Sequence, residues 1–416
     1  MNKKPSIDAF VAKESQKEQR IYADYSATTP CALEVVEEML PYFTTHFGNP
    51  SSKSHSFGWE AEEAVEKARE KLAKAINCSP KELIFTSGAT ESNNIAIKGA
   101  YRYLSRASNK NHIITTLIEH KCVLASCEAL EQEGAEVSYV KMDKYGIIDL
   151  EDLKSKIKPN TGLVSVIYVN NEIGVIQPMS EIAKICRENG VLLHTDAAQA
   201  VGRIKIDASE VDLMSISGHK MYGPKGIGAL YIKKRVRLER IMSGGGQEKG
   251  LRSGTLPVPL CVGLGKAAEL GENLRESEWE RMKELSSYLA NTITSNLAGV
   301  TLNGHPEYRI PHNLHFSFSC VEGESLMMRL KNIALSSGSA CTSGSLEPSY
   351  VLTAIGLDED LVHTGLRIVL GRYTTIEEVE IMGRKIVEAV NKLRSFSPLW
   401  PEEKSTSDIN LRKNSA

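Results

Sequence analysis

Short apolar segments rich in β-branched residues alternate with stretches of helical spacing between residues 83 and 232. The seven apolar segments are Leu83–Phe85, Ile113–Thr116, Val137–Val140, Leu163–Val169, Val191–Thr195, Leu213–Ile216 and Ala229–Ile232. Because parallel strands need helical crossovers between them, this alternation predicts an α/β fold with a doubly wound, mostly parallel sheet of seven strands. Such sheets bind ligands at the carboxyl ends of their strands, so the polar residues that follow each segment are the first candidates for a site.

The 416-residue chain is long enough for two or three domains. We expect a large ligand-binding domain over residues 21–275, which contains all seven apolar segments. A charged helical segment, Trp279–Leu297, then leads into a smaller α/β domain over residues 276–400. Residues 1–20 form a leader without a clear targeting pattern, and residues 401–416 are rich in Ser, Lys, Glu and Asn. Both ends are expected to be flexible.

Charge and cysteine usage narrow the classes of function. The 50 Lys+Arg nearly balance the 52 Asp+Glu, which argues against nucleic acid or an anionic membrane as the main partner. No apolar run approaches the roughly 18 residues of a membrane span, and residues 1–20 lack the apolar core of a secretory signal. The eight cysteines include no Cys-x-x-Cys pair, which favours reduced thiols over disulfides or a metal site. We therefore expect a cytoplasmic protein that binds no metal.

Two other motifs point to different ligands but are weak. Gly263–Ala268 matches a dinucleotide-binding fingerprint, yet Pro257 and Pro259 stand where that fingerprint requires a strand. His312 and His315 could form a metal-binding pair, but no third ligand is evident.

Polar residues at three strand ends suggest a specific chemistry. Thr86–Glu91 is a turn of small residues that opens a helix; its N–H groups suit a phosphate, although an ordinary helix start has the same pattern. Asp196 and Lys220 follow two successive segments, and each alone is more often a cap or a surface charge. Together, a lysine that can hold an aldehyde as a Schiff base and a carboxylate that keeps a pyridine nitrogen protonated predict pyridoxal 5'-phosphate as the cofactor.

Ten motifs occur in order along the chain: Tyr22–Pro30, Phe47–Pro50, Thr86–Ser92, Glu119–Lys121, Val169–Gly174, Asp196–Gln199, Ser217–Gly226, Gly244–Gln247, Arg252–Thr255 and Ser336–Ser343. With these motifs the chain resembles the cysteine desulfurases of the housekeeping iron–sulfur type, which fall in the class V aminotransferase group. The resemblance extends from Tyr22 to Trp400. It implies the type I pyridoxal-phosphate fold and the conversion of L-cysteine to L-alanine. Residues 1–20 and the tail after Trp400 depart from the family pattern.

The resemblance assigns cofactor-binding roles to Ala89, Thr90, His120, Asn171, Asp196, Gln199, Ser217, His219, Lys220 and Thr255. Lys220 would form the Schiff base, and Asp196 would contact the pyridine nitrogen. Gln199 and Asn171 would lie near the ring oxygen. The phosphate would be held by Ala89, Thr90, Ser217 and His219. His120 would stack on the ring and assist proton transfer, since imidazole exchanges protons near pH 7, although a histidine after a strand is more often structural.

Two further roles follow from the same resemblance. Arg367 would bind the substrate carboxylate by a two-pronged contact, with Asn171 beside it, whereas an ion pair on the domain surface is the plainer interpretation. Thr255 would reach the phosphate bound to a second subunit, so a homodimer is expected.

Cys341 lies in the segment Ser336–Pro348, whose residues are too small to pack as a core element. A mobile thiolate suits attack on the sulfur of the substrate. The resemblance makes Lys220, Cys341 and His120 the catalytic residues. It also implies that a persulfide on Cys341 is passed to an iron–sulfur scaffold protein or other sulfur acceptors, with transient cluster contact at Cys341. A selenocysteine lyase or another lyase of this fold would depend little on Cys341, and a non-catalytic platform for a scaffold protein would not need it.

Overall fold

The computed structural model describes residues 20–337 and 348–400. Cys341 and most of the segment predicted to carry it lie outside these ranges, as do residues 1–19 and 401–416.

Seven strands form one sheet in the order β2-β8-β7-β6-β5-β3-β4. Their bounds are β2 (Leu83–Thr86), β3 (His112–Thr116), β4 (Glu136–Val140), β5 (Thr161–Ser165), β6 (Leu192–Asp196), β7 (Leu213–Ser217) and β8 (Gly228–Ile232). Only β8 runs antiparallel to its neighbours, β2 and β7, so the other strands all share one direction. The predicted seven-stranded, mostly parallel sheet is confirmed.

The observed strand bounds differ from the predicted ones chiefly at β5. The apolar segment Leu163–Val169 predicts a strand there, but regular pairing ends at Ser165. The chain still runs beside β6, because Val166 N donates to the His194 carbonyl at 3.1 Å and Tyr168 N to the Asp196 carbonyl at 3.0 Å. The sequence stays apolar beyond Ser165 because this segment remains buried, although it no longer pairs as a regular strand.

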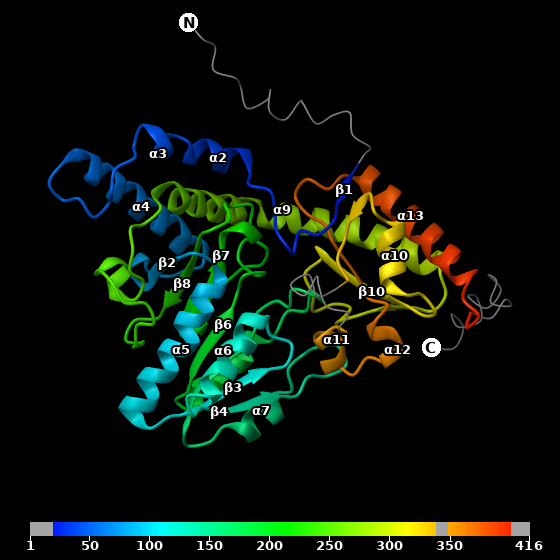
Figure 1. Ribbon diagram of the computed structural model, residues 1–416, viewed down its shortest axis with the longest axis horizontal. Helices are drawn as coiled ribbons and strands as arrows, with labels where there is room; N and C mark the ends of the chain where they lie inside the picture. Colours follow the sequence, from blue (N-terminus) through cyan, green and yellow to red (C-terminus); the bar gives the residue numbers. More distant parts are fainter. Residues whose placement is uncertain (1–19, 338–347, 401–416) are drawn as a thin grey trace, which may run out of the picture.

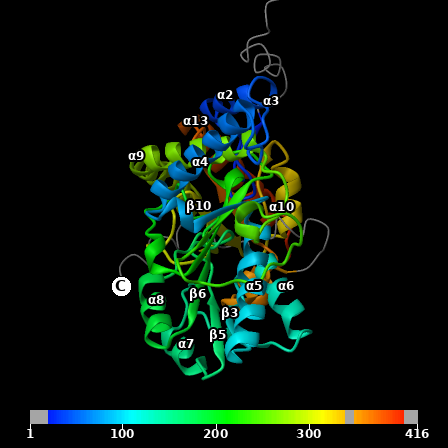
Figure 2. The same ribbon diagram turned by 90° about the vertical axis from the view of Figure 1, so that its left-hand side faces the viewer.

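Helices cover both faces of the sheet, with α5 and α6 on one side and α8 on the other (Figure 2). Their bounds are α2 (Leu33–Met39), α3 (Pro41–Thr44), α4 (Ser56–Ala75), α5 (Ala89–Ser108), α6 (Lys121–Glu131), α7 (Leu150–Lys156) and α8 (Met179–Glu188). Short 3-10 helices span Pro80–Glu82, Ala208–Glu210, Gly218–Lys220 and Gln247–Gly250. On α8 the buried residues Met179, Ile182, Ala183 and Cys186 recur every three or four positions, which places one apolar stripe against the sheet.

The continuous helix α9 (Val258–Asn296) joins two separately packed parts of the molecule (Figure 1). Its first half packs against α4, and α13 (Ile376–Arg394) also packs against it. Gly265 allows the close approach to α4, because a Cβ there would lie 2.6 Å from Ala68 Cα. The expected domain boundary at residue 275 therefore falls inside a helix. Within the described ranges, no helix combines the length and the apolarity needed to cross a membrane.

The smaller part contains an antiparallel sheet in the order β12-β10-β9, where β9 is Val300–Leu302, β10 is Asn313–Phe318 and β12 is Leu366–Val369. The helices that accompany it are α10 (Gly323–Arg329), α11 (Tyr350–Ala354), α12 (Glu359–Val362) and α13. The strand β1 (Ile21–Tyr22) pairs in parallel with β11 (Ile333–Ala334). Ile21 and Ala23 thus pack in the smaller core, although the sequence analysis placed them in the large domain.

Candidate active site

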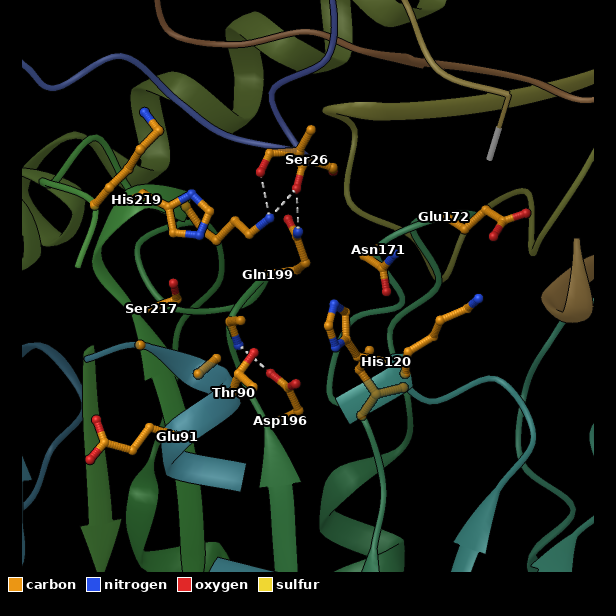
Figure 3. Close-up of a pocket in the computed structure, with 18 of the residues that line it drawn as sticks. Ser26, Thr90, Glu91, His120, Asn171, Glu172, Asp196, Gln199, Ser217 and His219 are labelled. Carbon is orange, nitrogen blue, oxygen red and sulfur yellow. Dashed lines mark hydrogen bonds between the residues drawn. The ribbon is translucent and has the colours of Figure 1, made fainter. Parts of the chain in front are cut away.

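A cavity of about 550 Å³ lies at the carboxyl ends of the parallel strands (Figure 3). The predicted residues that line it are Ala89, Thr90, His120, Asn171, Asp196, Gln199, Ser217, His219, Lys220 and Arg367. Thr255 is exposed and does not line this cavity. Residues that line it without having been predicted include Ser26, Ser87, Glu91, Lys121, Glu172, Lys225 and Tyr350. In Figure 3, Thr90, Ser217 and His219 lie on one side, His120 and Asn171 lie on the other, and Asp196 lies between them.

The turn after β2 leaves an open cradle in front of α5. Gly88 has a φ of 151°, which side chains rarely adopt, and no atom lies within 4 Å of the position its Cβ would take. α5 begins at the next residue, Ala89, so the N–H groups of its first turn lie beside this space. The Glu91 carboxylate in that turn accepts from Ser87 N at 2.5 Å and from Arg252 Nε at 3.1 Å. With this negative charge paired, the cradle suits a phosphate.

His219 and Lys225 lie at the same end of the cavity. Burial, together with the charges of Lys220 and Lys225, lowers the pKa of His219 to about 4, so its ring is neutral at pH 7. Its Nδ1 lies 3.1 Å from Thr28 Oγ1. Lys225 belongs to the recognised motif Ser217–Gly226, which begins at the end of β7, and its place in that motif is the signal that could have identified it.

Lys220 lies at the end of the short 3-10 helix that follows β7. Its Nζ donates to the carbonyl oxygens of Ser26 at 2.6 Å and Ala27 at 2.7 Å. Gln199 Nε2 donates to the same Ser26 oxygen at 2.9 Å. The segment that contains Ser26 and Ala27 therefore forms part of the wall around the Lys220 amine. The spacing of the strands in the sequence could not predict this contact.

Asp196 is the last residue of β6 and is 4% exposed. Its Oδ2 accepts from Asn93 Nδ2 at 2.7 Å, and its Oδ1 accepts from Ala198 N at 2.9 Å. Asn93 comes from the second turn of α5, so the helix that forms the cradle also orients this carboxylate.

His120 is the N-cap residue of α6, and its Nδ1 accepts from Cys122 N at 3.2 Å. The residue before it, Glu119, is fully buried, and burial raises the pKa of its carboxyl to about 8. Glu119 Oε1 accepts from Thr116 Oγ1 at 2.8 Å and from Ile167 N at 2.9 Å. These two donors only partly offset the loss of solvent.

The opposite wall comes from the smaller part of the molecule. Arg367, on β12, is 1% exposed; its Nη2 donates to Asp24 Oδ1 at 2.7 Å and its Nη1 donates to the Asn171 carbonyl at 3.1 Å. Beside it, burial raises the pKa of the Glu172 carboxyl to about 7, although the Ser349 hydroxyl donates to it and the Arg367 charge is near. The cavity thus receives a guanidinium from a strand that lies far from the others in sequence.

One cavity therefore combines an anion cradle, a buried carboxylate, a lysine amine and an imidazole ring. This set fits pyridoxal phosphate: the open space at Gly88 accepts its phosphate, Asp196 suits its pyridine nitrogen, and Lys220 can bond its aldehyde. In the described part of the chain, no group of three or more His, Cys, Asp or Glu side chains is arranged to hold a metal ion. Fold and cavity define the class of type I pyridoxal-phosphate enzymes.

Comparison with known proteins narrows this class. The aminotransferase class-V family matches residues 21–382. A Rickettsia bellii protein named cysteine desulfurase IscS is 56% identical over 397 residues, which cover 94% of this chain and 96% of that protein. The human cysteine desulfurase is 55% identical over 384 residues, which cover 91% of this chain and 84% of that protein.

Solved structures of similar proteins superpose on this chain over most of its length. A NifS-like protein superposes with a TM-score of 0.84 at 37% identity, covering 90% of this chain and all of that one. A structure described as SspA in complex with cysteine superposes with a TM-score of 0.76 at 38% identity, over 85% of this chain and all of that one. The chain belongs to the aminotransferase class-V family, and it shares the dependence of that family on pyridoxal phosphate.

Proposed function

We propose that the protein is a cysteine desulfurase: it converts L-cysteine to L-alanine and transfers the sulfur, as a persulfide on Cys341, to acceptors for iron–sulfur cluster assembly. The observation that carries the proposal is the convergence of Lys220, Asp196, His120 and Arg367 on one cavity. The high identity to proteins named cysteine desulfurase selects this reaction among those of the family.

Bound pyridoxal phosphate supplies a ring that stabilises negative charge developing at the substrate Cα. The Asp196 carboxylate, held by Asn93 and Ala198, keeps a proton on the pyridine nitrogen. Lys220 Nζ, which two carbonyl oxygens hold in place, removes the Cα proton. Arg367 binds the substrate carboxylate through its guanidinium fork.

The Cys341 thiolate accepts the sulfur atom of the substrate cysteine. The carbon–sulfur bond breaks, a sulfur–sulfur bond forms on Cys341, and the remaining carbon takes a proton, so cysteine and one thiol become alanine and one persulfide. His120 is the donor we assign to that proton, because its ring lines the cavity across from the phosphate cradle (Figure 3). The loop 336–348 that carries Cys341 belongs to the small domain in this proposal.

The active form of the enzyme is a homodimer in which both subunits contribute residues to each cofactor site. Thr255 is exposed and lies outside its own cavity, which supports a contact across a subunit interface. The sulfur acceptor is an iron–sulfur scaffold protein or another sulfur-requiring protein, and a cluster contacts Cys341 transiently. A cytoplasmic location fits the seven described cysteines, all of which are free thiols.

The test is the product balance of the purified protein loaded with pyridoxal phosphate. L-Cysteine should yield alanine and, with a reductant present, an equal amount of sulfide. The Cys341→Ser variant should lose both products and carry no added sulfur in mass spectra. Cys320→Ser is the matched control, since this thiol lies in the small domain and contacts the Leu399 carbonyl instead of the cavity. Unchanged turnover in Cys341→Ser would contradict the proposal and favour a lyase that does not use this thiol.

A further inference from the structure

The thiol of Cys122 contacts the ring of His120 from outside the cavity. The distance from Cys122 Sγ to His120 Nδ1 is 3.0 Å. Asn93 Nδ2 donates to the same sulfur at 3.1 Å and to Asp196 Oδ2 at 2.7 Å. A continuous chain of polar contacts thus joins the Asp196 carboxylate to the His120 ring. Cys122 itself does not line the cavity.

The directions of these hydrogen bonds follow from the chemistry of the groups. The Cys122 backbone N–H can only donate, and it donates to His120 Nδ1 at 3.2 Å. Nδ1 is therefore the ring nitrogen without a proton, and the proton of the neutral ring resides on Nε2. The Asn93 amide nitrogen also only donates, so the Cys122 sulfur accepts from it and its S–H points to His120 Nδ1.

We propose that Cys122 is a positioning residue for His120: its S–H and its backbone N–H together hold the ring in the orientation and tautomer with the proton on Nε2, and Asn93 links this arrangement to Asp196. Resting on the proposed function, this gives His120 a fixed donor atom for the proton that completes alanine. A thiol suits the position because the sulfur accepts from one neighbour while its proton serves the other.

Packing alone does not account for Cys122. Cys127, on the same helix, is fully buried in an apolar cluster and serves as a small apolar side chain. Cys122 is half-buried at the edge of that cluster, and its sulfur contacts two polar side chains. A side chain that only filled space would leave Asn93 Nδ2 and His120 Nδ1 with one partner fewer each.

The experiment compares Cys122→Ala with Cys122→Ser in the protein loaded with pyridoxal phosphate. The serine hydroxyl can accept from Asn93 and donate to His120, whereas alanine can do neither. We expect kcat to fall roughly three- to tenfold in Cys122→Ala, the range of one hydrogen bond, and to stay within about twofold of the parent in Cys122→Ser. KM should change less than kcat in both variants. Cys127→Ala, which removes a thiol from the same helix without touching His120, should keep the parent kcat.

Nitrogen-15 NMR of histidine-labelled protein measures the tautomer of the His120 ring independently of turnover. A His120→Gln variant assigns the His120 signals. The parent and Cys122→Ser should show the proton on Nε2. In Cys122→Ala, Nδ1 keeps the backbone N–H of residue 122 but loses the S–H donor, so a detectable fraction of the ring should carry its proton on Nδ1. An unmixed Nε2–H tautomer in Cys122→Ala, or an equal loss of kcat in Cys127→Ala, would overturn the proposal. If the NMR change appears but the parent makes no alanine from cysteine, the positioning role stands and the proposed reaction fails.

Discussion

The two walls of the cavity are built by different means. The wall formed by the parallel sheet presents Asp196 as the last residue of β6 and Lys220 at the end of the short 3-10 helix after β7, so the strand ends place them. The wall formed by the smaller part presents Arg367 from the middle of β12, where pairing with β10 and contact with Asp24 and Asn171 hold it. In the proposed mechanism, the first wall carries the chemistry of the cofactor and the second recognises the substrate. Changes in the first should therefore act on kcat, and changes in the second on KM.

The largest effect should come from Lys220→Ala. The carbonyl oxygens of Ser26 and Ala27 hold the Lys220 amine in the cavity, so the variant should lose the visible absorption of the bound cofactor and lower kcat by more than about 10⁴-fold, the upper end of what one proton-transferring group contributes. Absorption spectra and alanine release measure both effects. Retained turnover would show that the first wall does not carry the chemistry.

The second largest effect concerns two buried carboxyls, Glu119 next to His120 in the chain and Glu172 near Arg367. Burial raises the pKa of Glu119 to about 8 and that of Glu172 to about 7, from an unfolded value of 4.5. Because the folded protein holds these protons more tightly than the unfolded chain, each carboxyl lowers stability progressively as pH rises from about 4.5 to its folded pKa. Glu119→Gln should therefore gain stability relative to the parent over pH 4.5 to 8, by at most about 5 kcal/mol. For Glu172→Gln the gain should level off near pH 7.

Urea unfolding at several pH values, with cofactor present, measures this difference. Glutamine can still accept from Thr116 and Ile167 at position 119, so the variant retains the hydrogen bonds of the protonated acid. Parallel pH dependence of Glu119→Gln and the parent would mean that this carboxyl has the same pKa in the folded and unfolded chain.

Arg367→Lys tests the second wall. Lysine keeps the charge but loses the fork that can bind a carboxylate through two hydrogen bonds. We expect KM for cysteine to rise roughly ten- to hundredfold, the value of one hydrogen bond to a charged group, while kcat changes less. Arg394→Lys is the control, because Arg394 is a buried arginine of the smaller part. In the described ranges its side chain donates to the backbone carbonyls of Ser319, Ala298 and Gly299 and stacks on the Trp400 ring. A fall in kcat with an unchanged KM would assign Arg367 to the chemistry of the first wall.

The smallest effect should come from Thr255, which in the proposed homodimer adds a contact from another subunit to the first wall. Thr255→Ala should weaken retention of the cofactor by roughly tenfold, the lower end for a hydrogen bond to a charged group. Mixed dimers of Thr255→Ala and Lys220→Ala chains provide the check. In such a dimer, the site that retains Lys220 receives an intact Thr255 from its partner and should regain the parent affinity. Equal cofactor loss in mixed dimers and Thr255→Ala homodimers would place the contact within one chain.

The predictions from sequence are best in the first wall. Except at β5, the apolar segments define the strands almost to the residue. Asp196 and Lys220 follow from those strand ends because parallel strands all end at one edge of the sheet. The cradle at Gly88 is equally local, since only a residue without a side chain leaves that space open. The family resemblance, not periodicity, pointed to His120 and Arg367.

The sequence by itself determined the alternation of strands and helices, the order of the motifs and the residue types at the strand ends. Only the tertiary structure decided that Asn93 would orient Asp196, that Ser26 would hold the Lys220 amine, and that Glu172 would be buried beside Arg367. It also decided that β1 would pair with β11, across more than 300 residues of sequence. The physical reason is the distance along the sequence between the residues that interact. Turns and helix starts depend on neighbours a few residues apart. The contacts above depend on how separately formed elements pack, and no local pattern encodes that packing.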